Sequence, residues 1–262
     1  MALDPGLSVA FEFACRVERC YAALISVAGA AEPDAEPSLG GQLLYASQLD
    51  EETRALVVAA NIAGAASLVV TADAAAQKQA VRDGVADFLV NSLTEALRIL
   101  KNEIRKRQPV AVCVAASPED VEREMIERGV APDLLVAGLR FPLALEKRAR
   151  RIEPAPTNQD GTLAAWSVAA EPARWLPKLD AIALDCMRVE DAPARRWLRL
   201  APRYMGRMAQ GVRVLSCSPN AASELMARTR RAVEQGEIGV PVEIRLTTEG
   251  RSERSLVPPL IR

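Results

Sequence analysis

Polar and thiol side chains follow several predicted strands directly, where a doubly wound α/β fold binds its ligands. Thr71 and Asp73 follow one strand, Ser117 follows another, Asp185 ends a third and Cys217 ends a fourth. Because the carboxyl ends of parallel strands meet at one edge of a sheet, the sequence predicts that these side chains line a common crevice. They would be the polar contacts of a nucleotide or of another small molecule.

Two of these positions have a structural interpretation as well. Cys217 lies just before Ser218, a predicted helix cap, and a helix N-terminus can lower the pKa of a thiol. The alternative is a small buried hydrophobic side chain at a strand end. Asp185, beside Cys186, is the best candidate for a residual site, and the alternative is a cap for the following turn or helix. The sequence leaves both interpretations open.

The complete absence of histidine narrows the chemistry that this chain can perform. It excludes Ser-His-Asp and Cys-His catalysis, and it excludes metal sites that need imidazole ligands. The five cysteines are scattered and form no CxxC pair, so we expect no cysteine-only metal site either. Any chemistry must therefore use Asp, Glu, Lys, Arg, Tyr, Cys or a bound cofactor.

Short apolar strands that alternate with helices must position the strand-end residues. The pattern predicts strands at 42–46, 67–71, 87–90, 110–115, 133–137, 180–185, 212–216 and 241–247. It predicts helices at 51–64, 74–83, 93–107 and 118–129. Capping patterns such as Ser117-Pro118-Glu119-Asp120 support these helix starts. The sequence thus predicts an α/β, Rossmann-like, doubly wound and mostly parallel sheet.

The two ends of the chain differ from this regular part. Residues 8–28 have the apolar spacing of an amphipathic helix, and a linker rich in proline and small residues follows near 29–41. We therefore predict a helical arm with its linker at 1–37 and a Rossmann-like domain at 38–262. The stretch 153–178 is predicted as a long loop, and the pattern does not define the topology after about residue 140.

Three stretches, in order, resemble the central dinucleotide-binding region of urocanases. They are "AGAASLVV" (63–70), "VRDGVADFLVNSLTEALRIL" (81–100) and "RQPVAVCVAASPEDVEREMIERGVAPDLLV" (107–136). Urocanases are the urocanate hydratases of histidine breakdown, which use tightly bound NAD as an electrophile. The resemblance covers 38–136 and, weakly, 9–29. It implies a Rossmann-like fold and makes NAD the cofactor of the family.

The resemblance fails where the family binds its cofactor. The glycine loop of the family falls on Gln48-Leu49-Asp50-Glu51-Glu52-Thr53-Arg54, which contains three carboxylates and no glycine. Glycines there let backbone N–H groups approach a pyrophosphate at a helix N-terminus. The carboxylates at 50–52 would instead stabilise that positive helix end, by about 0.3–1 kcal/mol each, and would repel an anion. The ribose-binding acid of the family falls on Thr71, with Asp73 as a substitute two residues later.

We therefore expect a divergent, stand-alone urocanase-like protein that has lost the NAD glycine loop and the catalytic domain. We expect no cofactor and a non-catalytic role in binding or assembly. One alternative is an enzyme that uses the strand-end crevice for a different nucleotide or small molecule. A less favoured alternative is urocanate hydratase itself, an NAD-dependent lyase.

Composition sets the expected partners and compartment. The formal net charge is −1, which favours neither nucleic acid nor an anionic membrane surface, and no apolar run approaches the length of a membrane span. An odd number of scattered cysteines is typical of reduced thiols, so we expect a cytoplasmic protein. We expect the arm at 8–28 to dock on a second copy, which predicts a homodimer, and an unknown protein partner is a further expectation.

Overall fold

The computed structural model of the chain describes residues 5–28, 36–154, 161–209, 211–248 and 251–258. Its contacts divide the chain into two compact units, residues 19–155 and residues 1–18 with 156–262. Helix α1 (Pro5–Val27) contributes to both units. The separate prediction of a domain boundary between residues 37 and 38 stays a prediction.

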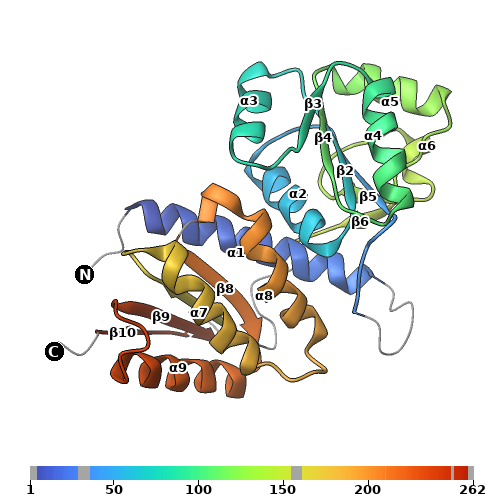
Figure 1. Cartoon of the computed structure of the whole chain (residues 1–262). Helices are drawn as coiled ribbons and strands as arrows, with labels where there is room; N and C mark the ends of the chain where they lie inside the picture. Colours follow the sequence, from blue (N-terminus) through green and yellow to red (C-terminus); the bar gives the residue numbers. More distant parts are fainter. Residues whose placement is uncertain (1–4, 29–35, 155–160, 210, 249–250, 259–262) are drawn as a thin grey trace. The chain divides into compact units, whose positions relative to one another are not determined.

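The unit of residues 19–155 is built on a six-stranded sheet with the order β3-β4-β2-β1-β5-β6 (Figure 1). Every neighbouring pair in this sheet is parallel. Its strands are β1 (Leu43–Ala46), β2 (Ala66–Val70), β3 (Phe88–Val90), β4 (Ala111–Val114), β5 (Leu134–Val136) and β6 (Arg150–Ile152). The predicted fold class, an α/β Rossmann-like fold with an N-terminal helix, is confirmed.

Helices connect these strands where the sequence predicts them. They are α2 (Glu51–Ala63), α3 (Ala74–Arg82), α4 (Leu93–Arg105), α5 (Pro118–Glu127) and the short α6 (Leu143–Glu146). The side chains of Asp50, Asp73, Ser92 and Ser117 cap the first four. Helix α2 ends at Gly64, whose φ of 96° lies in the left-handed region that glycine adopts without strain. Local capping chemistry thus defines where the helices of this unit begin.

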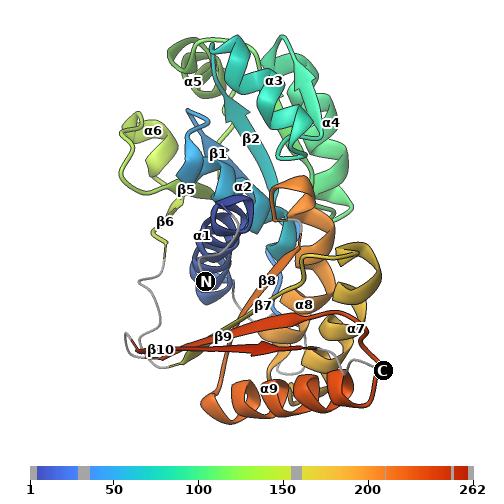
Figure 2. The ribbon, with the colours of Figure 1, turned by 90° about the vertical axis from the view of Figure 1, so that its left-hand side faces the viewer.

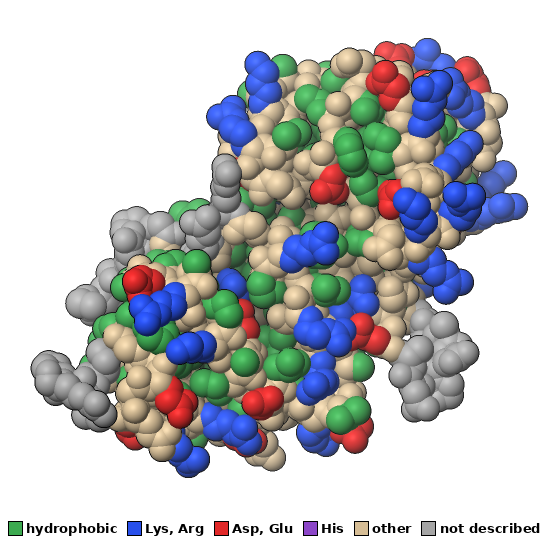
Figure 3. Space-filling model, viewed as in Figure 1, with side chains coloured by type: hydrophobic (Ala, Val, Ile, Leu, Met, Phe, Trp, Pro, Cys, Tyr) green, Lys and Arg blue, Asp and Glu red, His purple; other side chains and the backbone are tan. Residues whose placement is uncertain are grey.

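The helices lie in two layers, one on each face of the parallel sheet. Side chains of α4, α5 and α6 pack in one core cluster with the side chains on one face of the sheet, Tyr45, Leu68 and Val112 among them. Right-handed crossovers place α2 and α3 on the other face, as Figure 2 shows. On the outward side of α4, Arg98, Lys101 and Arg105 are exposed. Figure 3 shows basic side chains gathered over this part of the molecule. Helix α4 is therefore amphipathic, as its sequence predicts.

The other unit holds a four-stranded antiparallel sheet with the order β10-β9-β7-β8. Its strands are β7 (Thr162–Ser167), β8 (Val212–Cys217), β9 (Val242–Thr248) and β10 (Arg251–Val257). Its helices are α7 (Pro172–Asp185), α8 (Ala192–Tyr204) and α9 (Pro219–Glu234). In Figure 1 they lie along one face of the sheet and along its β8 edge. Leu7 and Phe11 of α1 line a small cavity together with Ala165 and Val212 of this sheet. Arg245 stacks on the Phe11 ring, 4.9 Å from its centroid.

The sequence-based description of residues 153–185 is partly wrong. The segment predicted as a loop at 153–178 contains β7 and the first half of α7, although residues 155–160 lie outside the described part. The strand predicted at 180–185 is the C-terminal half of α7. Leu176, Leu179 and Ala183 are buried at helical spacing, and Pro177 within the run concealed that period because proline usually breaks a helix interior.

The remaining predicted strands at 212–216 and 241–247 are confirmed as β8 and β9, but they belong to the antiparallel sheet. Part of the predicted linker, residues 29–35, falls outside the described residues. Within the described ranges, no helix combines the length and the apolar character that crossing a bilayer requires.

Candidate functional site

The carboxyl edge of the parallel sheet is the place where a fold of this kind binds ligands. Strands β1 and β5 are neighbours in this sheet. The strands β2, β3 and β4 lie on one side of β1, and the chain then crosses to β5 on its other side. Because the connections leave β1 and β5 in opposite directions, the strand order reverses between them. The turns after β1, β2 and β4 therefore carry the residues to examine.

The turn between β1 and α2 is closed by its own side chains. The Asp50 Oδ1 atom accepts a hydrogen bond from the Thr53 N–H at 2.8 Å, and its Oδ2 atom accepts one from the Gln48 amide at 2.7 Å. Glu51 and Glu52 occupy the first turn of α2. The carboxylate of Asp50 thus satisfies one of the free N–H groups that a helix start presents.

The last two positions of this segment are tied into the unit. Thr53 is buried at 1 % exposure. Arg54 forms an ion pair with Asp83, whose side chain also accepts from Gln79. Both members of the pair are largely shielded from solvent. All these contacts hold the turn and α2 in place.

The turn after β2 uses its polar residues in the same structural way. Asp73 caps α3, because its Oδ1 atom accepts from the N–H groups of Ala75 and Ala76 at 2.8 and 3.3 Å. The Thr71 hydroxyl accepts from the Asp73 N–H at 3.2 Å, and Gln77 donates to the Thr71 carbonyl at 2.7 Å. Both predicted residues lie at the sheet edge, and both already have partners within the turn.

The turn after β4 is a serine cap with an acidic first turn. The Ser117 Oγ atom accepts from the Asp120 N–H at 3.3 Å and donates to Glu119 at 2.8 Å. The Ser117 hydroxyl is the main cause that lowers the pKa of Glu119. Thr71, Asp73 and Ser117 therefore all stand at one edge of one sheet, as predicted, and this edge is rich in carboxylates.

A buried tyrosine at the same edge was missed by the sequence analysis. The Tyr45 hydroxyl donates to Glu122 Oε1 at 3.0 Å, and its ring meets Phe141 edge to face with centroids 5.6 Å apart. Burial raises the pKa of Glu122, and burial together with the Glu122 charge raises the pKa of Tyr45. A tyrosine inside an apolar strand does indicate that its buried hydroxyl has a hydrogen-bond partner. No sequence pattern, however, identifies that partner as Glu122 on α5.

Asp185 and Cys217 belong to the other unit, and neither follows a strand of the parallel sheet. Asp185 is the last residue of α7, so its predicted place at the carboxyl end of a strand is wrong. Cys217 ends β8, and burial raises the pKa of its thiol to about 12. This direction is opposite to the one that activates a thiol, so Cys217 is protonated at neutral pH.

Among the residues that the structure describes, no three Cys, Asp or Glu side chains are grouped so that they could hold a metal ion. All five cysteines are free thiols.

Comparison with known families identifies the first part of the chain. Residues 21–137 match the model of the urocanase Rossmann-like domain. The match ends directly after β5, and all three stretches that carry the sequence resemblance lie inside it. The resemblance is confirmed for this region, which is similar to the urocanase Rossmann-like domain.

Proposed function

Given a urocanase-type Rossmann-like region at residues 21–137, we propose that its β1–α2 turn no longer binds NAD and that the protein works as a non-catalytic binding or assembly module. The observation that carries this proposal is the Asp50 cap. Its carboxylate occupies, at 2.8 Å from the Thr53 nitrogen, the helix end that a pyrophosphate would need.

Electrostatics argues in the same direction. Three consecutive carboxylates occupy the start of α2, with Asp50 at the cap and Glu51 and Glu52 in the first turn. The family resemblance places a glycine loop at these positions. A phosphate about 4 Å from one carboxylate is repelled by about 1 kcal/mol even in bulk water, and by more where solvent is excluded. A pyrophosphate would also have to displace Asp50 from its N–H partner. The residues present therefore do not fit the pyrophosphate of NAD.

The ribose position supports the same conclusion. Asp73, the substitute for the ribose-binding acid, uses its Oδ1 atom to cap α3. Thr71 hydrogen-bonds within its own turn. Binding a ribose there would compete with the start of a helix.

The test is a calorimetric titration of refolded protein with NAD. We expect no saturable heat at millimolar NAD, and micromolar binding would refute the proposal. A variant with Asp50→Asn, Glu51→Gln and Glu52→Gln removes the negative charges and should bind NAD more tightly than the wild type. Glu119→Gln with Asp120→Asn is the matched control, because it neutralises the first turn of another helix at the same edge. Equal effects of the two variants would mean that the β1–α2 turn is not the barrier.

A second candidate function rests on the pair of Tyr45 and Glu122. A carboxyl group with a raised pKa beside a buried hydroxyl, at the edge where this fold binds ligands, is a combination that enzymes use for acid–base chemistry. The alternative is therefore an enzyme that accepts a different nucleotide or small molecule at this edge. A thermal-shift screen of nucleotides and metabolites with wild type and Glu122→Gln tests it, because a true ligand should stabilise the wild type more.

Self-association and the cytoplasmic location also stay proposals. Helix α1 carries buried Phe13, Val17, Tyr21 and Leu24, and only Val9, near its start, is a large exposed apolar side chain among the described residues of this helix. Docking of this helix on a second copy would therefore take the form of an exchange of α1 between two chains. Light scattering over a range of concentrations decides between a dimer and a monomer. The free state of all five cysteines is compatible with a reducing compartment.

A further inference from the structure

The unit that contains the antiparallel sheet has a cavity between the α7–α8 turn and the start of α9. Its volume is about 260 Å³, and its lining combines charged and polar side chains with apolar surface. One wall is the turn with Cys186, Arg188 and Asp191, and the other is the start of α9 with Ser218, Asn220, Ala221 and Glu224. This volume lies just below the range typical of pockets for drug-sized ligands, so the cavity suits a small metabolite.

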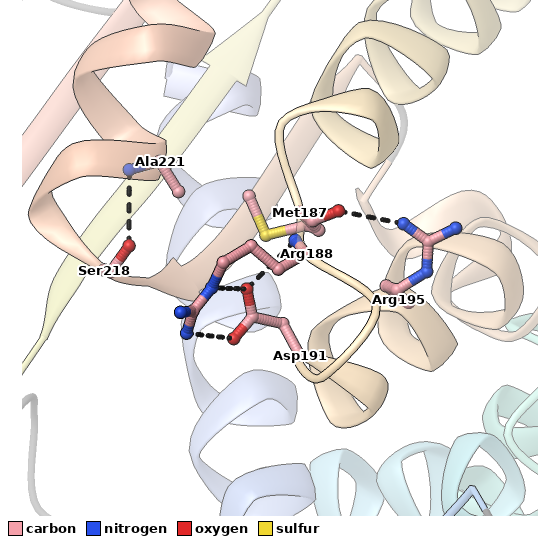
Figure 4. Close-up of polar contacts among 6 residues, drawn as sticks. All are labelled: Met187, Arg188, Asp191, Arg195, Ser218 and Ala221. Atoms are coloured by element: carbon pink, nitrogen blue, oxygen red, sulfur yellow. Dashed lines mark hydrogen bonds and ion pairs between the residues drawn. The ribbon is translucent and has the colours of Figure 1, made fainter.

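The turn that forms one wall is held in a fixed conformation. Asp191 accepts from the backbone N–H of Arg188 at 3.1 Å, while Arg195 donates to the carbonyls of Leu184 and Met187 at 3.2 and 3.0 Å. Figure 4 shows Arg195 securing the turn from the side opposite to Ser218. The backbone of this wall is therefore organised before any ligand arrives.

Arg188 is the cationic group of this cavity. Its guanidinium extends from the turn toward the start of α9 (Figure 4). Asp191 contacts it only at 3.4 and 3.5 Å, which is long for a charge-assisted hydrogen bond, and the Arg188 side chain is 74 % exposed. The guanidinium thus keeps N–H groups for another acceptor.

The two lining carboxylates, Asp191 and Glu224, are each paired with an arginine, and the remaining lining groups add hydrogen-bond donors. Within the described chain, the Asn220 amide has no hydrogen-bond partner, and the Ser218 hydroxyl accepts from the Ala221 N–H at 3.3 Å and can still donate. Glu224 is engaged by two nitrogens of Arg228, at 2.9 and 2.5 Å. Burial raises the pKa of Cys186, so its thiol is neutral at neutral pH and is itself a weak donor.

From this arrangement we propose that the cavity binds a small organic carboxylate. Arg188 forms the charged contact, and Asn220 and Ser218 donate to the remaining carboxylate oxygens. The volume leaves room for an organic body beside the carboxylate, which a simple inorganic anion would not fill. All residues that line this cavity belong to the antiparallel unit, so its assignment does not rest on the proposed function of the Rossmann-like region.

The test is a titration of the full chain, labelled with nitrogen-15, with succinate as the probe. We expect saturable shifts of the backbone amide signals of Arg188, Asn220 and Ala221. Succinamide, which has the same shape without charge, should produce no saturable shift. The variant Arg188→Gln should weaken succinate binding by about tenfold or more, because a hydrogen-bonded charge pair contributes at least that factor.

Arg174→Gln is the matched control. Arg174 is another exposed arginine of the same unit that pairs three residues away, with Glu171 at 3.2 Å, and it does not line the cavity. Its substitution should leave succinate binding unchanged. The proposal is overturned if succinate gives no saturable shift, if Arg188→Gln and Arg174→Gln bind it equally, or if succinamide binds as well. Inorganic phosphate is the second probe, and tighter binding of phosphate than of succinate would overturn the assignment to an organic carboxylate.

Discussion

Removal of the Asp50 cap tests how the start of α2 is stabilised. Asp50→Ala deletes the 2.8 Å hydrogen bond to the Thr53 N–H and also a negative charge at a helix N-terminus. Loss of a cap costs about 1 kcal/mol, and loss of the charge interaction costs about 0.3–1 kcal/mol. The exposed contact with Gln48 adds little. We therefore expect the free energy of unfolding to fall by about 1.5 kcal/mol.

Two further substitutions separate the cap from the charge. Asp50→Ser and Asp50→Asn both retain an oxygen that can accept from Thr53 but remove the charge, so each should cost about 0.5 kcal/mol. Glu127→Ala is the control, because Glu127 is an exposed acid at the opposite, C-terminal end of a helix, where its removal should be neutral or slightly stabilising.

Urea unfolding followed by far-ultraviolet circular dichroism measures these differences. Tryptophan fluorescence is recorded in parallel, because Trp166, Trp175 and Trp197 all lie in the unit of the antiparallel sheet. A transition that the fluorescence does not report can then be assigned to the Rossmann-like unit. If Asp50→Ala destabilises no more than Glu127→Ala, or if Asp50→Asn costs as much as Asp50→Ala, the cap is not what stabilises this helix start.

Three other substitutions have defined outcomes. Tyr45→Phe removes the donor that lowers the pKa of Glu122, so we expect this pKa to rise further when it is followed by nuclear magnetic resonance. The free energy of unfolding should fall by about 1 kcal/mol. An unchanged pKa of Glu122 would contradict the 3.0 Å hydrogen bond. Burial raises the pKa of Asp180 above its ordinary value of 3.8, so the native state holds the proton more tightly than the unfolded chain does. Compared with Asp180→Asn, the wild type should therefore lose stability as the pH rises from about 3.8 through the raised pKa. Parallel profiles of stability against pH for the two proteins would refute this. Trp197→Phe removes a buried N–H group that donates to the Val214 carbonyl at 2.6 Å. The free energy of unfolding in urea should fall by about 2 kcal/mol. A fall no larger than that caused by a substitution of an exposed residue would show that this hydrogen bond contributes little.

Local sequence signals were sufficient for the Rossmann-like region. Short apolar strands, helix caps such as Ser117 and the order of three family-like stretches predicted the parallel sheet and most of its helices. These signals succeed because a cap or a buried parallel strand depends on residues that are neighbours in sequence. They missed β6, whose two arginines resemble an exposed helix end, since only pairing with β5 makes that segment a strand.

The candidate site was predicted less completely. Thr71, Asp73 and Ser117 do stand at one sheet edge, because strand ends in a parallel sheet necessarily align. Asp185 was placed with them because α7 was taken for a strand, and Cys217 was placed with them because β8 was taken for a strand of the parallel sheet. The helical spacing of its buried residues is local, but Pro177 obscured it, and the antiparallel pairing of β7 with both β8 and β9 links residues far apart in sequence.

The sequence by itself thus determined the parallel sheet, its helix starts and the three carboxylates that stand where the family resemblance places a glycine loop. Only the tertiary structure decided that Tyr45 meets Glu122 and that Arg188 faces the start of α9 across a cavity. The physical reason is that these last contacts join elements whose approach depends on packing. Hydrophobic packing is non-directional, so the sequence period predicts that a face is buried and does not predict which side chains meet there.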